Sequence, residues 1–178
     1  MNKPTFSPTT IASAHRALNN RQALVITGPQ GCGKSVLARM LAAQFGTFVE
    51  GYGWQLTSAQ GMSELLGNSP DVVIVDECEP LFEDQGNDDS AAKLKQLITS
   101  REQCIRGPYG RVRTVPTPRY IFCSGHADFL QAETNNRRFF LVDLQDTQKA
   151  TLLEQFATFF KGMLRHGIKP DGEKGRAP

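Results

Sequence analysis

The chain has 178 residues, of which 39% are hydrophobic and 21% charged, and its formal net charge at pH 7 is +2. This length fits one compact domain with a substantial core, and the net charge is too small to indicate nucleic-acid binding by itself, so any basic surface must be local. The four cysteines lack metal-ligand spacing and no apolar stretch is long enough to span a membrane, which favours a soluble intracellular protein over a secreted or membrane protein.

Strand-like and helix-like segments alternate along the chain, which is typical of an α/β domain with a mostly parallel sheet. In chain order, the predicted elements are a helix over residues 10–20, a strand over 22–28, a helix over 34–45, a strand over 47–52, a helix over 59–66, a strand over 71–77, a loop over 83–89, a helix over 90–100, strands over 119–125 and 138–144, and a last helix that begins at Asp146. We expect a single domain over residues 1–166 and a flexible tail over residues 167–178.

The segment GPQGCGKS, residues 28–35, lies between a predicted strand and a predicted helix. It matches the phosphate-binding pattern G-x-x-x-x-G-K-[ST] in the structural context that the pattern requires. Its glycines let consecutive backbone N–H groups point at phosphate oxygens, and the start of the next helix adds the positive end of its dipole. We expect Lys34 to contact the β- and γ-phosphates of ATP and the Ser35 hydroxyl to bind Mg²⁺. The residues predicted to hold ATP are Gly28, Pro29, Gln30, Gly31, Cys32, Gly33, Lys34, Ser35 and Val36.

An acidic pair ends the most apolar strand, VVIVDE. We expect Asp76 to hold Mg²⁺, usually through water, and Glu77 to orient or deprotonate the water that attacks the γ-phosphate. Glu79 is a second candidate for the base. A carboxylate that activates water favours an ATPase over a small-molecule kinase, which activates a substrate hydroxyl instead.

Three later stretches resemble the virulence-associated protein E-like family. They are KLKQLITSREQCIRGPYGR (93–111), PRYIFCSGHADFL (118–130) and TNNRRFFLVDL (134–144). This family contains P-loop proteins of phages and mobile elements that are related to the superfamily 3 helicases within the AAA+ class. The resemblance, which covers residues 22–145, implies an AAA+-like P-loop αβα sandwich around a mostly parallel five-stranded sheet.

The resemblance also implies a function. Relatives of this kind are replication proteins, ring-forming ATPases that move along or melt DNA, and each nucleotide lies between two subunits. We therefore expect a Mg²⁺-dependent ATPase, a replicative helicase or replication-initiation ATPase, that acts on single-stranded DNA in the channel of a homo-oligomer, a hexameric ring, in the cytoplasm of a bacterial host. A primase or origin-binding partner would supply specificity. The alternative is a nucleotide-gated loader that couples the ATP state to a partner protein without unwinding DNA.

Two adjacent arginines, Arg137 and Arg138, directly precede the last apolar strand. Such a pair is often a solvated strand end, but a guanidinium group is also well suited to hold phosphate oxygens. In the related helicases a neighbouring subunit supplies an arginine finger from this place, so the resemblance implies that one of the two completes a neighbour's ATP site. Adjacent residues of an extended chain point to opposite sides, and we favour Arg138, next to Phe139, as the finger.

Relatives end the strand over residues 119–125 with an asparagine that senses the γ-phosphate. Here the comparable residues are Ser124, Gly125 and His126. We expect His126 or Ser124 to donate a hydrogen bond to the phosphate or to the attacking water, although a histidine in such a loop can also be a surface residue. The departure from asparagine bears on the hydrolysis of ATP rather than on its binding.

Residues 101–119 contain five arginines, together with proline and glycine turn signals that favour a hairpin or loop. In the related helicases, a hairpin just before the sensor strand points into the central channel and contacts DNA. The resemblance therefore implies DNA contacts by Arg111 and Arg113, with Tyr109 stacked on a base or packed beneath the hairpin. The alternative is a solvated basic loop that pairs with the acidic stretch over residues 83–89.

Overall fold

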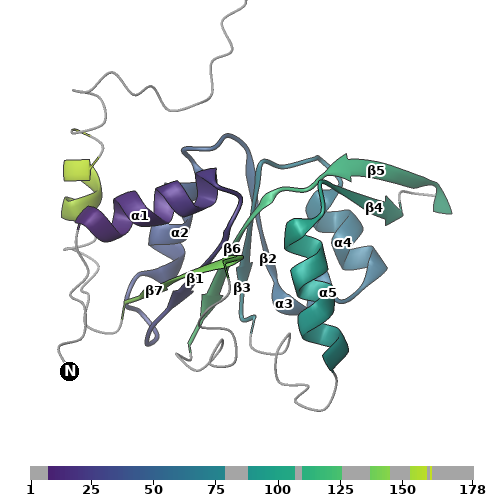
Figure 1. Ribbon diagram of the computed structural model, residues 1–178, viewed down its shortest axis with the longest axis horizontal. Coiled ribbons are helices and arrows are strands. Elements are labelled where there is room, and N and C mark those ends of the chain that lie inside the picture. Colours follow the sequence, from purple (N-terminus) through teal and green to yellow (C-terminus); the bar gives the residue numbers. More distant parts are fainter. Residues whose placement is uncertain are drawn as a thin grey trace, which may run out of the picture.

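The computed structural model describes residues 8–78, 88–106, 110–125, 137–144, 153–159 and 161. Helices and strands alternate broadly as predicted as far as residue 99, and then consecutive strands follow, of which those over residues 102–106 and 112–116 were not among the predicted elements (Figure 1). The helices are α1 (Pro8–Asn19), α2 (Lys34–Ala42), α3 (Gly53–Leu56), α4 (Ala59–Leu66) and α5 (Asp88–Thr99). The strands are β1 (Ala23–Thr27), β2 (Phe48–Tyr52), β3 (Val72–Asp76), β4 (Glu102–Arg106), β5 (Val112–Pro116), β6 (Arg119–Ser124) and β7 (Phe139–Asp143). Residues 153–159 are also helical.

Five strands form one sheet in the order β2-β3-β6-β1-β7, and every neighbouring pair is parallel. This confirms the predicted five-stranded sheet. All its strands end at one edge, termed the carboxyl edge, and begin at the opposite edge, termed the amino edge. At the carboxyl edge, Thr27 lies in register with Ser124 and Asp143, and Tyr52 lies in register with Asp76. Open α/β sheets bind their ligands outside this edge.

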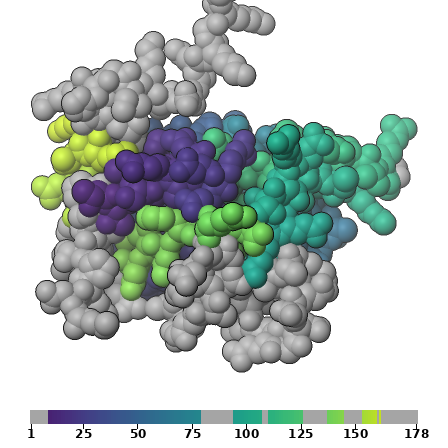
Figure 2. All heavy atoms as spheres, in the orientation of Figure 1, coloured from purple at the N-terminus to yellow at the C-terminus, as the bar shows by residue number. Residues whose placement is uncertain are grey.

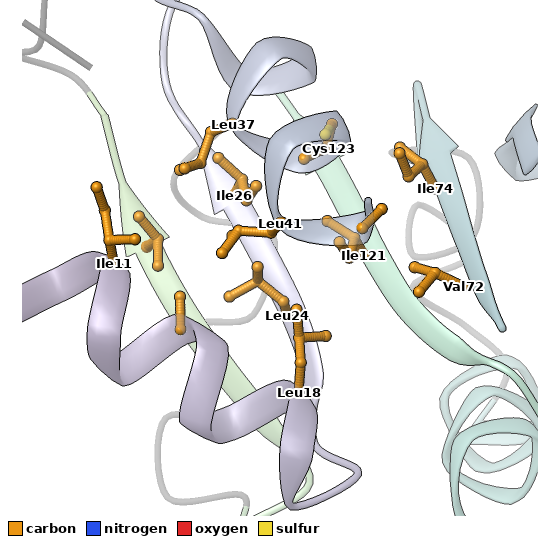
Figure 3. Close-up of a cluster of buried hydrophobic side chains, with 14 of the residues drawn as sticks. Ile11, Leu18, Leu24, Ile26, Leu37, Leu41, Val72, Ile74, Ile121 and Cys123 are labelled. Atoms are coloured by element: carbon orange, nitrogen blue, oxygen red, sulfur yellow. The ribbon is translucent and has the colours of Figure 1, made fainter. Parts of the chain in front are cut away.

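Both faces of the large sheet are buried, which gives the three layers of an αβα sandwich. Helices α1 and α2 cover one face, and α4, α5 and the strands β4 and β5 cover the other. Parallel strands that are buried on both faces have continuous apolar runs, as β1 and β3 do. Side chains of the first face that Figure 3 labels are Ile11, Leu18, Leu24, Ile26, Leu37, Leu41, Val72, Ile74, Ile121 and Cys123.

Strands β4 and β5 form a separate antiparallel hairpin. Figure 1 shows it at the end of the molecule opposite α1. Ile105 and Val115 are buried in the core of the second face and anchor the base of the hairpin. The Ser63 hydroxyl of α4 donates a hydrogen bond to the carbonyl oxygen of Arg106. These contacts hold the hairpin against the second face of the large sheet.

The sequence missed helix α3, which has only four residues and so carries no helical periodicity. It also placed the end of α2 at residue 45, whereas the helix ends at Ala42 and a turn leads to Gly46, where φ is 117°. Within the described ranges, no helix has the length and apolar character needed to cross a membrane.

Candidate nucleotide site

The segment GPQGCGKS forms the turn between β1 and α2, at the carboxyl edge of the sheet. Gly28, Gly31 and Gly33 have φ angles of 146°, 81° and 104°, which side chains rarely tolerate. A Cβ atom at Gly28 would lie 2.8 Å from the sulfur of Cys32, so the loop also closes too tightly for a side chain there. Gly33 directly precedes α2, whose first N–H groups have no partner within the helix. Such a loop can cradle an anion.

The ammonium group of Lys34 lies over this loop. It donates hydrogen bonds to the carbonyl oxygens of Gly28, at 2.7 Å, and Pro29, at 3.0 Å. These neutral acceptors hold the positive charge beside the space that the loop encloses. Phosphate oxygens would compete well for it, because hydrogen bonds between charged groups are about twice as strong as those to neutral acceptors.

Ser35 and Asp76, the two predicted magnesium ligands, lie in contact. The Ser35 hydroxyl in the first turn of α2 donates to Oδ2 of Asp76 at the end of β3, at 3.2 Å. Hydroxyl and carboxylate oxygens suit Mg²⁺, which keeps several waters and binds substrate phosphates as well. The described residues contain no group of three or more His, Cys, Asp or Glu side chains able to hold a metal. The two oxygen donors of Ser35 and Asp76 fit a magnesium ion that would take its other ligands from nucleotide and water.

Glu77 follows Asp76 in a strained backbone conformation. Its φ is 47°, a left-handed value that costs a residue with a side chain roughly 1–2 kcal/mol. Its N–H donates to Oδ1 of Asp76 at 3.1 Å, and the residue is exposed. Strain of this kind clusters at functional sites, so the conformation supports a special role for this carboxylate. The strand pattern predicted its place but carries no signal for its conformation.

One buried hydroxyl at the carboxyl edge was missed by the sequence analysis. Thr27, the last residue of β1, is fully buried, and its Oγ1 has no hydrogen-bond partner within the part of the chain that the structure describes. It lies in register with Ser124, which is also buried. A lone polar residue at the end of an apolar strand, directly before the loop, was the available signal. The pair places two hydroxyl groups beneath the loop.

All four cysteines are free thiols, and Cys32, Cys78 and Cys123 are buried. Cys78 donates a hydrogen bond to the carbonyl oxygen of Cys123 at 3.1 Å. Burial raises the pKa of the Cys123 thiol well above its ordinary value, and the nearby Asp76 carboxylate raises it further. This thiol therefore stays neutral at physiological pH and contributes packing rather than charge.

Arg137 and Arg138 lie at the amino edge, away from their own loop. The carbonyl oxygen of Arg138 accepts a hydrogen bond from the N–H of Ala23, the first residue of β1, at 2.8 Å. Ala23 and Gly28 are separated by the length of the five-residue strand β1, which is about 16 Å at roughly 3.3 Å per residue. Arg137 is exposed and Arg138 is half-buried. Neither side chain is long enough to reach the loop of its own chain.

The hairpin carries the arginines that the sequence linked to DNA. Arg111 is exposed, whereas the guanidinium group of Arg113 donates to the carbonyl oxygen of Gly67, just after α4. Helix α4 and the hairpin together line a hollow of about 1230 Å³, and Arg106 lines it as well. Three arginines and one carboxylate, that of Glu64, thus line this hollow, and no residue of the nucleotide loop lines it.

Three residues that the sequence singled out lie outside the described residues. They are Glu79, the second candidate for the base, His126, the candidate phosphate sensor, and Tyr109, the candidate for stacking on a DNA base. Their roles stay predictions.

Comparison with known proteins identifies the domain. The sequence profile of the virulence-associated protein E-like domain matches residues 9–162. No curated protein matches the chain.

Solved structures share the fold. The A form apo structure of the NrS-1 C-terminal region matches with a TM-score of 0.57 and 16% identity, over 98% of this chain and 47% of that chain. A second structure of that region matches with a TM-score of 0.54 and 15% identity, over 98% of this chain and 47% of that chain. NtrX from Brucella abortus in complex with ATP matches with a TM-score of 0.48 and 17% identity, over 96% of this chain and 45% of that chain. The chain thus spans about half the length of these structures, and the first two, at such low identity, show the fold alone.

Proposed function

The chain belongs to the virulence-associated protein E-like family, and on this premise we propose that it binds Mg²⁺-ATP at the carboxyl edge and hydrolyses it as a replication ATPase that acts on DNA. The observation that carries the proposal is the 3.2 Å contact between Ser35 and Asp76. These residues are far apart in the sequence, and each belongs to a separate motif that supplies a ligand to the same ion.

Each residue of the site has a role in this proposal. The loop N–H groups and Lys34 bind the phosphates, and Ser35 and Asp76 hold Mg²⁺, which supplies positive charge to the phosphate oxygens when it is bound. Glu77 orients the attacking water and accepts its proton. The exposed carboxylate beyond the end of β3 suits that task, because water must reach it.

The site is completed by a second copy of the chain. Arg137 and Arg138 lie at the amino edge, a full strand away from their own loop, so an arginine of this pair can act on ATP only in a neighbour. A finger in this role stabilises the charge of the transferring phosphoryl group. The two edges of the sheet cannot meet within one chain, and a head-to-tail ring, a hexamer in our proposal, brings them together.

DNA is proposed to contact the hairpin. Arg106, Arg111 and Arg113 line one hollow with polar groups of α4, and such cations contact phosphates without regard to base sequence. A ring with its hairpins in the channel would act as a helicase. A primase or origin-binding protein would direct it to its site.

The loader module is the second candidate. One observation favours it, because the guanidinium group of Arg113 is already held by a backbone carbonyl of its own chain. In this case a partner protein rather than DNA would stimulate hydrolysis.

The test is ATP hydrolysis by the purified chain with and without single-stranded DNA. Wild-type turnover should rise with DNA, and Glu77→Gln should lower it by about 10²- to 10⁴-fold, the usual contribution of a general base. Binding of a fluorescent ATP analogue should persist in this variant. The matched control is Glu154→Gln, an exposed carboxylate on the helical residues 153–159, which should hydrolyse ATP normally.

Two results would count against the proposal. Unchanged turnover in Glu77→Gln would remove the assigned base. Turnover that ignores DNA but rises with a replication partner would favour the loader.

A further inference from the structure

Three exposed aromatic side chains lie on the edge strand β2 and directly after it, and two of them, Tyr52 and Trp54, are at the carboxyl edge of the sheet. Phe48 and Tyr52 in the edge strand β2 are 38% and 50% exposed, and Trp54 in α3 is 58% exposed. We term Tyr52 and Trp54 the aromatic rim. Tyr52 lies in register with Asp76, so the rim adjoins the candidate nucleotide site. Tryptophan and tyrosine are enriched at the energetic centres of protein interfaces.

The backbone beneath the aromatic rim is firmly held. The Gln55 side chain accepts a hydrogen bond from the N–H of Tyr52 at 2.8 Å and donates one to Glu64 of α4 at 3.2 Å. A side chain at Gly61 would collide with the backbone of Gln55, so α3 packs closely on α4. The aromatic rings are therefore presented to solvent by a fixed segment, which makes the rim a preformed surface.

A second distinctive surface lies at the amino edge. Two adjoining hollows of about 280 and 420 Å³ share Arg21, Ile98 and Thr99 in their linings. Figure 2 shows this side, with residues 137–144 in light green between α1 in purple and α5 in teal. No aspartate or glutamate is among the described residues that line either hollow. The arginines that line this pair of hollows, termed the arginine hollow, are Arg21, Arg101, Arg119, Arg137 and Arg138.

The arginines of the hollow differ in how far the fold already uses them. Arg119 donates to the carbonyl oxygen of Leu18 at 3.1 Å, and its guanidinium lies 4.6 Å from the ring centre of Phe45, so it has a structural role. Arg21 donates one N–H to the carbonyl oxygen of Thr117 at 2.9 Å and keeps its other donors. Arg101 is exposed. Arg21 and Arg101 therefore retain the capacity to bind a partner.

The two surfaces are complementary. The aromatic rim borders the carboxylates of Asp76 and Glu77, whereas the arginine hollow offers only cations among its charged lining. Guanidinium groups stack on aromatic faces and pair with carboxylates. Because the surfaces lie at opposite edges of one sheet, a chain cannot join its own pair. Two copies in head-to-tail order can, and this is the order that a shared ATP site requires.

We propose that the aromatic rim of one copy docks on the arginine hollow of the next, with Tyr52 and Trp54 against the guanidinium groups of Arg21 and Arg101. This contact rests on the proposed function, because it assumes that Arg137 or Arg138 of the second copy reaches the ATP of the first. It adds residues that hold the two copies in place while the finger acts. Phe48 begins β2 at the amino edge and lies outside this contact.

Trp54 provides its own probe, because it is the single tryptophan of the chain. We expect its emission to shift to shorter wavelength when the full chain assembles with Mg²⁺ and a non-hydrolysable ATP analogue, since the ring then leaves water. Sedimentation velocity on the same samples measures the assembly. Trp54→Ala, Tyr52→Ala, Arg21→Ala and Arg101→Ala should each raise the concentration at half-assembly by about tenfold or more, as interface anchors do. Leu153→Ala, a change at another exposed apolar side chain, should leave it unchanged.

The outcomes separate this contact from the proposed function. Assembly without a shift in Trp54 emission, or assembly that tolerates the rim variants, overturns the contact and leaves the shared site standing. A shift caused by single-stranded DNA without a change in mass assigns the rim to nucleic acid and also overturns it. Absence of assembly, together with turnover that is indifferent to Arg137 and Arg138, overturns both proposals.

Discussion

The two edges of the sheet differ in how completely their charged groups are organised. At the carboxyl edge, groups from separate segments meet, with Ser35 on Asp76 and Lys34 on the carbonyls of the loop. At the amino edge, arginines surround two hollows that no described carboxylate lines. The first edge has the groups that our proposed phosphate site needs. For the arginines of the second edge we propose a role at the ATP site of a neighbouring copy.

Part of the positive charge at the amino edge has a local cause. Helices that cover a parallel sheet run against its strands, so α1 and α5 end at the amino edge with their carbonyl groups. Cations near helix C-termini are favourable. Arg119 serves the end of α1 in this way, through the carbonyl of Leu18. Arg137 has no such contact with a helix end among the described residues. Its substitution is therefore the more informative test of the shared site.

The largest expected effect comes from substitutions of the two arginines at the amino edge. One of Arg137→Ala and Arg138→Ala should lower ATP turnover by about 10³- to 10⁵-fold, the value of an arginine finger. Each chain keeps its own loop, so binding of a fluorescent ATP analogue should change by less than about threefold, within 1 kcal/mol. Arg16→Ala, at an exposed arginine of α1, is the control and should turn over normally. Normal turnover in both arginine variants would show that this edge has no part in catalysis.

A smaller effect should follow from a change in the loop of the carboxyl edge. In Gly28→Ala, the new Cβ atom would lie 2.8 Å from the sulfur of Cys32 and 3.2 Å from the Cβ atom of Leu144, and the φ angle there is 146°. We therefore expect the free energy of unfolding to fall by about 1–3 kcal/mol and ATP binding to weaken. Gly31→Ala is the matched control, because its φ is 81° but open space surrounds it. Urea denaturation should therefore find Gly28→Ala the less stable of the two. Equal stability would mean that the loop is looser than its contacts indicate.

The smallest expected effect lies beside the carboxyl edge. Arg39 donates two hydrogen bonds of 2.7 Å to Glu50, and this partner lowers the pKa of the Glu50 carboxyl. Because the pKa is lower in the folded chain than in the unfolded chain, the pair stabilises the fold fully at any pH above the unfolded pKa. This contribution is lost as the pH falls through the folded pKa. Glu50→Gln should thus be slightly less stable than wild type at pH 7, and the difference should vanish only when the pH falls below the lowered pKa of the folded Glu50 carboxyl. Thermal unfolding across this range measures the difference, which the exposure of the pair keeps small.

Much of the carboxyl edge was predictable because its residues obey local rules. The spacing of Gly28, Gly33 and Lys34 and the apolar run before Asp76 fix a loop and a strand end, and parallel strands bring such ends to one edge. The contact of Ser35 with Asp76 follows from that topology. The left-handed backbone of Glu77 does not, since tertiary packing decides it and no residue pattern records it.

The amino edge was harder to predict. The pair Arg137 and Arg138 stood out in the sequence, but Arg21 and Arg101 did not, because the α1–β1 turn and the end of α5 become neighbours only when the sheet forms. The aromatic rim was missed for a similar reason. Tyr52 and Trp54 look like core residues in a sequence, and their exposure depends on β2 being an edge strand and on the short helix α3.

The central claim is that one copy supplies the loop and the next supplies the arginine, and a mixing experiment tests it most directly. Lys34→Ala disables the loop and leaves the arginines intact, whereas the inactive variant of Arg137 or Arg138 has the opposite defect. Each should be inactive alone. An equal mixture should regain about a quarter of the wild-type turnover, because one in four head-to-tail contacts then joins a sound loop to a sound arginine. A mixture no more active than its two components would contradict the shared site.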